Sequence, residues 1–258
     1  MSGSLSLSQG QISMQSVTVS QDPFFNDVVL LTGFNGNFND ESNLNHTPTV
    51  VGGVSVSPTD AYFPANSVGQ FPASGIDSDY VEYPISSDFR LEMTEDWTIE
   101  LFFRLSALTN EYRTPLWFWD NSTLTIDVGV AGTQRGFGFI IQRTGGPGGP
   151  IFSFRYISAD VVRYTIAGPT ISANTWYYAA VVNDGATRTA TLYLNNSTIG
   201  TGVGTANGLG SDMVCSIGRT KTEFANFERD WGGQIEEVRV TRAKRTISGI
   251  PTEPFPRS

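Results

Sequence analysis

Cysteine and histidine are nearly absent from this 258-residue chain, since each occurs once, as Cys215 and His46. A single cysteine cannot close an intrachain disulfide, and with one histidine it cannot build a thiolate metal cage. Any catalytic device of the Ser-His-Asp or Cys-His kind would have to use His46. Its setting, Asn-Leu-Asn-His-Thr-Pro, favours a histidine in a turn.

Charge is also scarce, because charged residues make up 16% of the chain against about 25% in an average soluble domain. The 16 Lys and Arg against 25 Asp and Glu leave a net charge of −9. Binding to phosphates needs a basic face, so we expect no nucleic-acid partner. No stretch approaches the roughly 18 apolar residues of a membrane span, so we expect no membrane partner either.

The composition that remains is typical of a surface-exposed β protein. Glycine (27 residues), proline (13) and aromatic residues (12%) are abundant. The single cysteine and an N-terminus without the basic and hydrophobic parts of a signal peptide are typical of a protein made in a reducing cytoplasm. We therefore expect an exterior-facing protein that folds inside a cell.

Hydrophobic residues alternate with a period of two along most of the chain, which indicates strands with one buried face. In segment 97–105 every odd position is apolar, and three of the four even positions are polar. Further strand-like runs occupy residues 28–35, 79–84, 115–120, 123–130, 136–143, 151–157, 176–183, 188–195 and 234–240. Close, fairly even turn signals between them predict an all-β antiparallel sandwich or barrel.

Local irregularities refine this prediction. Residues 145–150 (GGPGGP) and 183–185 (Asn-Asp-Gly) fit hairpin turns. In segment 234–240, Ile235 falls on one face while Val238 and Val240 fall on the other. If all three are core residues, a β-bulge near Glu236–Glu237 must reset the register.

The chain divides into a short arm and one domain. Residues 1–21 form an uncharged, Ser/Gln-rich stretch, which is either an unstructured terminus or an arm docked as an added edge strand. Residues 22–258 carry the strand pattern and are expected to form a single domain with a Pro-rich C-terminal tail.

Five segments follow one another along the chain: LLTGFNGNFNDESNLNHTPTVVGGVSV, DYVEYPISSDFRL, EDWTIELFFRL, NTWYYAAVVNDGATRTATLYLNNSTIGTG and IGR…WGGQIEEVRVTRAKR…PTEPFP. Together and in this order they resemble the laminin-G-like jelly roll of the concanavalin A-like lectin/glucanase superfamily. The last segment is similar to the closing strand, basic turn and Pro-rich tail of such domains in bacteriophage structural proteins. The resemblance covers roughly residues 27–256 and implies a two-sheet antiparallel jelly-roll sandwich.

The resemblance implies a non-enzymatic bacteriophage virion protein, displayed as a capsid decoration, fibre or tail-associated module. Its role would be particle stabilisation or adhesion to the host surface. The implied partners are other virion proteins of the capsid or fibre and a cell-surface glycan, with the protein synthesised in the host cytoplasm and located on the virion surface. The N-terminal arm or the tail at 250–256 would anchor it. The alternatives are a free carbohydrate-binding lectin of a bacterium or prophage and, more remotely, a glucanase-type glycoside hydrolase.

Where domains of this family hold calcium, an Asp after the closing-strand Ile can contribute a ligand with oxygens of the early loop. The corresponding residues here are Glu236 and, in the loop, Asp40, Asn43 and Asn45. Glutamate is longer than the usual Asp, and the loop also fits an Asn/Asp-rich turn. We therefore expect no cofactor, with calcium as the alternative.

Glucanases of the superfamily carry a Glu-x-Asp-x-x-Glu strand whose spacing can bring a nucleophile and a general acid together on one face. Only Asp77, Asp79 and Glu82 have this spacing, and the run begins with Asp. Asp79 also falls where non-catalytic laminin-G-like domains have a structural Asp-Tyr. We therefore predict no catalytic residues.

Aromatic residues are the natural candidates for contact with sugar rings. Trp117 and Trp119 fall on one face of a predicted strand, Tyr112 precedes them, and Trp231 lies before the closing strand. These four are the predicted glycan-binding residues. The competing interpretation is that the paired Trp residues belong to the core, because large aromatic side chains usually bury most of their area.

Charge is unevenly placed along the chain. Eight acidic residues and only Arg90 occupy positions 77–100, whereas the basic residues Arg239, Arg242, Lys244 and Arg245 crowd seven positions. This pattern indicates either ordinary pairing within the chain or complementary contacts between copies, and the latter would favour a homo-oligomer.

Overall fold

The computed structural model describes residues 22–64, 66–72, 75, 78–108, 112–120, 136–142, 150–157, 163–204, 208–209, 212–219 and 228–258. Regular structure in these segments is almost entirely β-strand, with two single-turn 3-10 helices, η1 (Phe25–Asp27) and η2 (Ser87–Phe89). None of their helices is long and apolar enough to cross a membrane.

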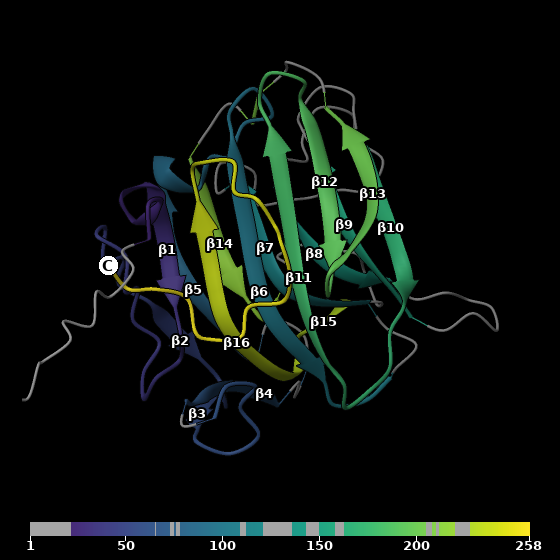
Figure 1. Cartoon of the computed structure of the whole chain (residues 1–258). Coiled ribbons are helices and arrows are strands. Elements are labelled where there is room, and N and C mark those ends of the chain that lie inside the picture. The colour runs from purple at the N-terminus through teal and green to yellow at the C-terminus, as the bar shows by residue number, and fades with distance from the viewer. Residues whose placement is uncertain are drawn as a thin grey trace, which may run out of the picture.

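Two mainly antiparallel sheets of eight strands each face one another (Figure 1). Sheet A has the order β13-β12-β11-β6-β16-β4-β3, with β1 beside β16; sheet B has the order β10-β9-β8-β7-β14-β5-β2, with β15 beside β7. The strands of sheet A are β1 (Val28–Thr32), β3 (Ser55–Ser57), β4 (Val68–Pro72), β6 (Trp97–Leu105), β11 (Trp176–Asp184), β12 (Thr189–Leu194), β13 (Ser197–Val203) and β16 (Gly232–Thr241). Those of sheet B are β2 (Thr49–Val51), β5 (Tyr80–Ser86), β7 (Tyr112–Asp120), β8 (Gly136–Gln142), β9 (Ile151–Ile157), β10 (Arg163–Thr170), β14 (Met213–Ile217) and β15 (Glu228–Arg229). The predicted all-β jelly-roll sandwich is confirmed.

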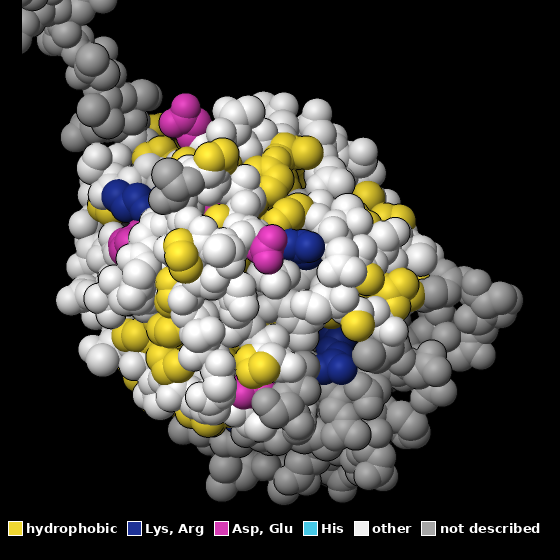
Figure 2. Space-filling model, turned by 90° about the horizontal axis from the view of Figure 1, so that it is seen from below, with side chains coloured by type: hydrophobic (Ala, Val, Ile, Leu, Met, Phe, Trp, Pro, Cys, Tyr) yellow, Lys and Arg dark blue, Asp and Glu magenta, His cyan; other side chains and the backbone are white. Residues whose placement is uncertain are grey.

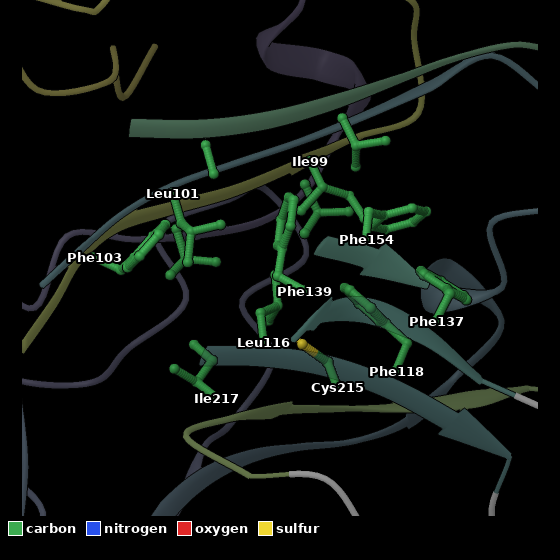
Figure 3. Close-up of a cluster of buried hydrophobic side chains, with 14 of the residues drawn as sticks. Ile99, Leu101, Phe103, Leu116, Phe118, Phe137, Phe139, Phe154, Cys215 and Ile217 are labelled. Carbon is green, nitrogen blue, oxygen red and sulfur yellow. The ribbon is translucent and has the colours of Figure 1, made fainter. Parts of the chain in front are cut away.

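The core lies between the sheets and is rich in aromatic side chains. In Figure 3, Ile99, Leu101 and Phe103 of β6 point toward side chains from the opposite sheet, including Phe139 of β8 and Phe154 of β9. All of these side chains are buried. Alternation along each strand sends every second residue into this layer, which is why the period-two signal was informative.

Strand positions agree with the sequence prediction where alternation was clear. The predicted segments 97–105 and 151–157 coincide with β6 and β9, and the predicted hairpin at 183–185 joins the antiparallel pair β11 and β12. Strands β8 and β9 also pair antiparallel, as predicted for the two sides of the glycine-rich turn. The turn itself and the predicted strand 123–130 lie outside the described residues.

The predicted bulge is confirmed in β16. The register between β16 and β6 shifts between Glu236 and Arg239, and Glu237 has a φ of 53°. The shift places Ile235, Val238 and Val240 all at 0% exposure in the core. It also directs two consecutive carboxylates toward segments that cover the outer face of sheet A.

The C-terminal segment 242–258 runs back across that outer face (Figure 1). Phe255 is buried in a cluster with Phe102 and Tyr178, and its amide N–H donates to Glu237 at 3.0 Å. The Pro-rich tail therefore packs on the domain's own sheet, and its expected role as an anchor to a partner stays a prediction.

The basic run 239–245 is paired within the chain. Arg242 and Arg245 bind Glu95 and Glu100, so two members of the acidic segment 77–100 meet two members of the basic run. The other pairs are Arg239 with Asp22 and Lys244 with Asp184. Of the two interpretations of this pattern, pairing within the chain is the one that these contacts support.

Candidate functional site

A pocket of about 440 Å³ opens at the lower end of the sandwich, in the orientation of Figure 1, where strands of both sheets begin or end. Turn and loop residues come from before β3 and after β6, and strand residues come from β3, β4, β7 and the start of β16. The lining residues are Gly53, Ser55, Gln70, Phe71, Pro72, Ser106, Ala107, Arg113, Gly232, Gly233 and Gln234. We call this feature the rim pocket. Its volume lies within the range typical of small-ligand sites.

Two buried carboxylates hold the frame of the rim pocket. One carboxylate oxygen of Asp230 accepts bonds from the amides of Ser78 and Asp79 at 2.6 and 2.9 Å and from the Ser78 hydroxyl at 2.9 Å. Asp79 in turn accepts the Gly53 amide at 2.8 Å. Three chain segments that are distant in sequence are thereby fixed beside one another. Because charge-assisted bonds to backbone amides are strong, this frame is preorganised.

Glycine allows the backbone to form part of the pocket wall. Gly233 has a φ of 154°, and a Cβ there would lie 2.1 Å from the Arg104 carbonyl oxygen. Gly52, beside the lining residue Gly53, has a φ of 76° and no room for a Cβ against the Ser78 carbonyl, at 1.8 Å. Both conformations are accessible to glycine at no steric cost.

The described lining residues combine polar groups with the apolar side chains of Phe71, Pro72 and Ala107, and none of them is a carboxylate. The amide side chains of Gln70 and Gln234 come from directly paired positions on β4 and β16, and Ser55 is paired with Gln70 on the other side. Oε1 of Gln234 is buried and has no hydrogen-bond partner among the described residues. Arg113 is the one charged residue among the described residues of the lining, and it donates to the Asp230 carbonyl oxygen. The pocket therefore presents amide, hydroxyl and backbone groups. Figure 2 shows the same end of the molecule, where uncharged surface predominates.

The carboxylates with glucanase-like spacing have structural partners. Asp79 belongs to the pocket frame, and Glu82 forms an ion pair with Arg219 at 2.5 Å. The Arg219 guanidinium also stacks on Tyr80, 3.4 Å from the ring centroid. Asp77 lies outside the described residues.

The proposed calcium ligands are likewise occupied. Asp40 is buried and accepts the amides of Leu31, Ser42 and His46 at 2.9–3.0 Å, so it organises the early loop. Glu236 is bound to a different segment, the loop between β3 and β4, through the amides of Tyr62 and Phe63 at 2.5 and 3.3 Å. Asn43 donates to Asn26, and Asn45 lies in the turn with a φ of 50°. In the described segments no group of three or more His, Cys, Asp or Glu residues has a metal-binding arrangement.

The predicted glycan-binding Trp residues are packed rather than displayed. Trp117 and Trp119 are 1% and 3% exposed and cluster with Ile157 and Val214, and the Trp119 indole N–H donates to Ser216 at 3.1 Å. This burial supports the interpretation that they are packed residues, in a cluster separate from the one between the sheets, and their contact with a glycan stays a prediction.

Two other predicted residues flank the rim pocket in sequence. Trp231 is fully buried against Phe103, with ring centroids 5.7 Å apart, and precedes the lining residue Gly232. Tyr112 precedes the lining residue Arg113, and its side chain lies outside the described residues. The aromatic signal thus pointed to two chain positions that adjoin lining residues of the rim pocket, and glycan contact by Tyr112 and Trp231 stays a prediction. This signal missed Gln70 and Gln234, because isolated neutral amides carry no motif.

Comparison with known proteins identifies the class. Residues 75–250 match the model of the concanavalin A-like lectin/glucanases superfamily. This match covers more than half of the chain, so the chain belongs to that family. Curated protein sequences gave no match.

Solved structures share the fold at low sequence identity. The binding domain of Paraclostridial Mosquitocidal Protein 1 superposes with a TM-score of 0.61 at 12% identity, over 87% of this chain and 51% of the other. Domain 4 of AbnA, a GH43 extracellular arabinanase from Geobacillus stearothermophilus, in complex with arabinotriose, gives 0.58 at 13%, over 86% and 95%. The binding domain of botulinum neurotoxin DC in complex with rat synaptotagmin II gives 0.60 at 13%, over 86% and 50%. The chain thus spans about half the length of the toxin binding domains. At these identities the likeness shows the fold alone.

Proposed function

We propose that this protein is a non-catalytic, lectin-like binding domain that recognises a neutral glycan in the rim pocket. The observation that carries the proposal is the pocket lining, in which Gln70, Gln234 and Ser55 present amide and hydroxyl groups. Such groups donate and accept hydrogen bonds to sugar hydroxyls. Oε1 of Gln234 is buried and unpaired within the part of the chain that the structure describes. A hydrogen bond from a ligand donor to this atom would remove the cost of leaving it unsatisfied and so favour binding.

A neutral ligand is favoured over an acidic one by the charge around the pocket. Arg113 contributes one positive charge, but it lies beside Asp230, whose carboxylate is buried, and Asp230 binds the amide of the equally buried Asp79. The positive charge is therefore offset within the frame. An anionic sugar would gain little Coulomb energy here.

Similar structures support binding rather than catalysis. The arabinanase domain was solved with arabinotriose, and the toxin domains are named as binding domains. Fold likeness alone cannot assign a function, so the pocket chemistry has to carry the argument.

We place this domain on the surface of a bacteriophage virion, as a decoration, fibre or tail-associated module that is made in the host cytoplasm. The support is the sequence of the closing strand, basic turn and Pro-rich tail, together with low charge and a single cysteine. Since the tail packs on sheet A, residues 1–21 are the candidate anchor to capsid or fibre proteins. A free lectin of a bacterium or prophage is the alternative. Mass spectrometry of purified virions decides between them, because absence of the polypeptide from the particle would remove the virion proposal.

The glycan proposal is tested on the purified full chain with an array of neutral and acidic oligosaccharides, followed by calorimetric titration of the best neutral binder. We expect Gln70→Ala and Gln234→Ala each to weaken binding about fivefold or more, equivalent to about 1 kcal/mol. Asn196→Ala, at an exposed position outside the pocket, is the matched control and should bind like the wild type. Equal affinity in all variants, or binding of acidic sugars only, would contradict the proposal.

A further inference from the structure

A single row of side chains crosses the outer face of sheet A from the rim pocket. Strand register places Ser55, Gln70, Gln234, Arg104 and Trp176 opposite one another on five adjacent strands. The first three line the pocket and the last two lie beyond it. Neighbouring strands are about 4.8 Å apart, so the row extends over about 19 Å. This is longer than a single sugar ring.

Trp176 provides an accessible aromatic surface at the far end of this row. Its side chain is half-buried at the margin of the outer-face cluster, where its ring meets Tyr62 at 6.0 Å and 69°. Tyr62 in turn packs on Phe102 at 4.5 Å. Within the described segments the Trp176 indole N–H has no hydrogen-bond partner. The ring is thus held in place from one side while part of it and its donor remain free for a ligand.

An ion pair formed by Arg104 lies between the pocket residue Gln234 and Trp176 in this row. Arg104 Nη1 lies 3.6 Å from Asp60 Oδ1, and the Arg104 and Asp60 side chains are 22% and 60% exposed. Asp60 lies in the loop between β3 and β4, beside the outer face of the sheet. The pair offers donors and acceptors with no net charge. This is the same neutral, hydrogen-bonding character that the pocket has.

We propose that Trp176, with the Arg104–Asp60 pair, forms a second sugar subsite contiguous with the rim pocket, so that the ligand is a linear neutral oligosaccharide. One unit occupies the pocket, the next contacts the ion pair, and a further unit places its C–H face on the indole. The inference rests on the proposed glycan function and adds the length of the ligand. It locates the aromatic contact at Trp176 on β11, away from the buried Trp117, Trp119 and Trp231.

Titration with two ladders of probes tests the subsite: arabinose, arabinobiose and arabinotriose, and glucose, cellobiose and cellotriose. In the wild type we expect the trisaccharide of the preferred ladder to bind about tenfold more tightly than its monosaccharide. Trp176→Ala should abolish this gain with length and leave monosaccharide affinity unchanged, whereas Trp176→Phe should retain part of it. Trp176→Phe should also remove part of any change in tryptophan fluorescence on trisaccharide binding.

Tyr193→Ala is the matched control, because Tyr193 is another half-buried aromatic residue at the margin of the same cluster but lies off the row. It should lose packing as Trp176→Ala does and keep the gain with length. Equal losses in Trp176→Ala and Tyr193→Ala, or an undiminished gain in Trp176→Ala, would overturn the subsite while leaving the pocket proposal intact. If the wild type binds none of the probes, both the pocket proposal and the subsite proposal are overturned for these sugars. If monosaccharide binding is lost only in the Gln70 and Gln234 variants, the pocket proposal is supported.

Discussion

Arg257, the penultimate residue, donates to the Glu237 carboxylate of β16 through both terminal guanidinium nitrogens, at 2.9 Å from Nη1 to Oε2 and 2.7 Å from Nη2 to Oε1. Glu237 is fully buried, and the same carboxylate accepts the Phe255 amide. The end of the chain is thus tied to the bulge that the closing strand needs for its register.

Removing the carboxylate should therefore release the tail and destabilise the domain. We expect Glu237→Ala to lower the free energy of unfolding by about 2 to 4 kcal/mol, because it leaves the buried Phe255 amide without its acceptor and leaves Arg257 with Glu41 as its remaining ion-pair partner among the described residues. The measurement is urea denaturation followed by intrinsic fluorescence. Glu253→Ala, an exposed acidic residue of the same tail, should change stability by less than about 0.5 kcal/mol. Similar stabilities of the two variants would show that the tail is held by Phe255 packing alone.

Strands with clean alternation were predictable because burial on one face dictates their pattern. Even the bulge followed from Ile235, Val238 and Val240, which cannot all reach the core in a regular strand. Short edge strands such as β2 and β3 escaped prediction, because three residues with one exposed face carry too little periodicity. The fold of the tail escaped as well, since its binding depends on Glu237, whose position is set by long-range pairing.

The candidate site was harder to predict than the fold. Gln70 and Gln234 are brought together only because β4 pairs with the first half of β16. Asp79 and Asp230 also meet although 151 positions separate them in the sequence. The sequence pattern connected Asp79 only with Asp77 and Glu82 or with a structural Asp-Tyr, so the role of Asp230 was not predicted. Hydrophobic alternation assigns Trp117 to a face but does not reveal whether that face is exposed, and here it is buried.

Glu236 should make the stability of the domain depend on pH. Burial raises the pKa of its carboxyl from 4.5 to about 7, against the opposing effect of the Tyr62 and Phe63 amides. The folded state therefore binds this proton more tightly than the unfolded chain does. Its stabilising effect is full below about pH 4.5 and is lost as the pH rises through about 7. Urea midpoints measured between about pH 5 and about pH 8 should fall less in Glu236→Gln than in the wild type. An identical slope for both proteins would refute this assignment.

Gly138 of β8 allows Trp117 to lie close to the sheet. Its φ is 156°, and a Cβ there would be 2.2 Å from the Leu116 carbonyl oxygen and 3.0 Å from the Trp117 ring. Gly138→Ala should lower the free energy of unfolding by about 1 to 3 kcal/mol, because the new methyl group would clash with the backbone and the buried Trp117 ring has no space to move away. Gly249→Ala, whose Cβ would have its nearest neighbour at 3.9 Å, is the control and should have little effect. Thermal unfolding of both variants provides the comparison.

Trp117 and Trp119 can be assigned to core or ligand site by separating folding from binding. Because both are buried, we expect Trp117→Ala to lower stability by about 3 to 5 kcal/mol. Trp119→Phe should keep most of the packing while losing the bond to Ser216. If Trp119→Phe folds like the wild type but loses glycan binding, these residues form a ligand site as the sequence first suggested. Unchanged glycan affinity in Trp119→Phe, together with a strongly destabilised Trp117→Ala, identifies them as core.

Asp230 should act on ligand binding without touching the ligand. Its carboxylate holds the Ser78 and Asp79 amides, and Asp79 holds Gly53 of the pocket wall. Asp230→Asn replaces the charged carboxylate by a neutral amide, which is a weaker acceptor for the Ser78 and Asp79 amides. The Gly53 segment should therefore shift, and the affinity for the pocket ligand should fall several-fold. The discriminating readout is the gain in affinity with oligosaccharide length, which Trp176 controls and which should survive in Asp230→Asn. Asp60→Asn should give the opposite pattern, because Asp60 pairs with Arg104 in the proposed second subsite. If both substitutions lower monosaccharide affinity and length dependence alike, the pocket and the second subsite are not separate units.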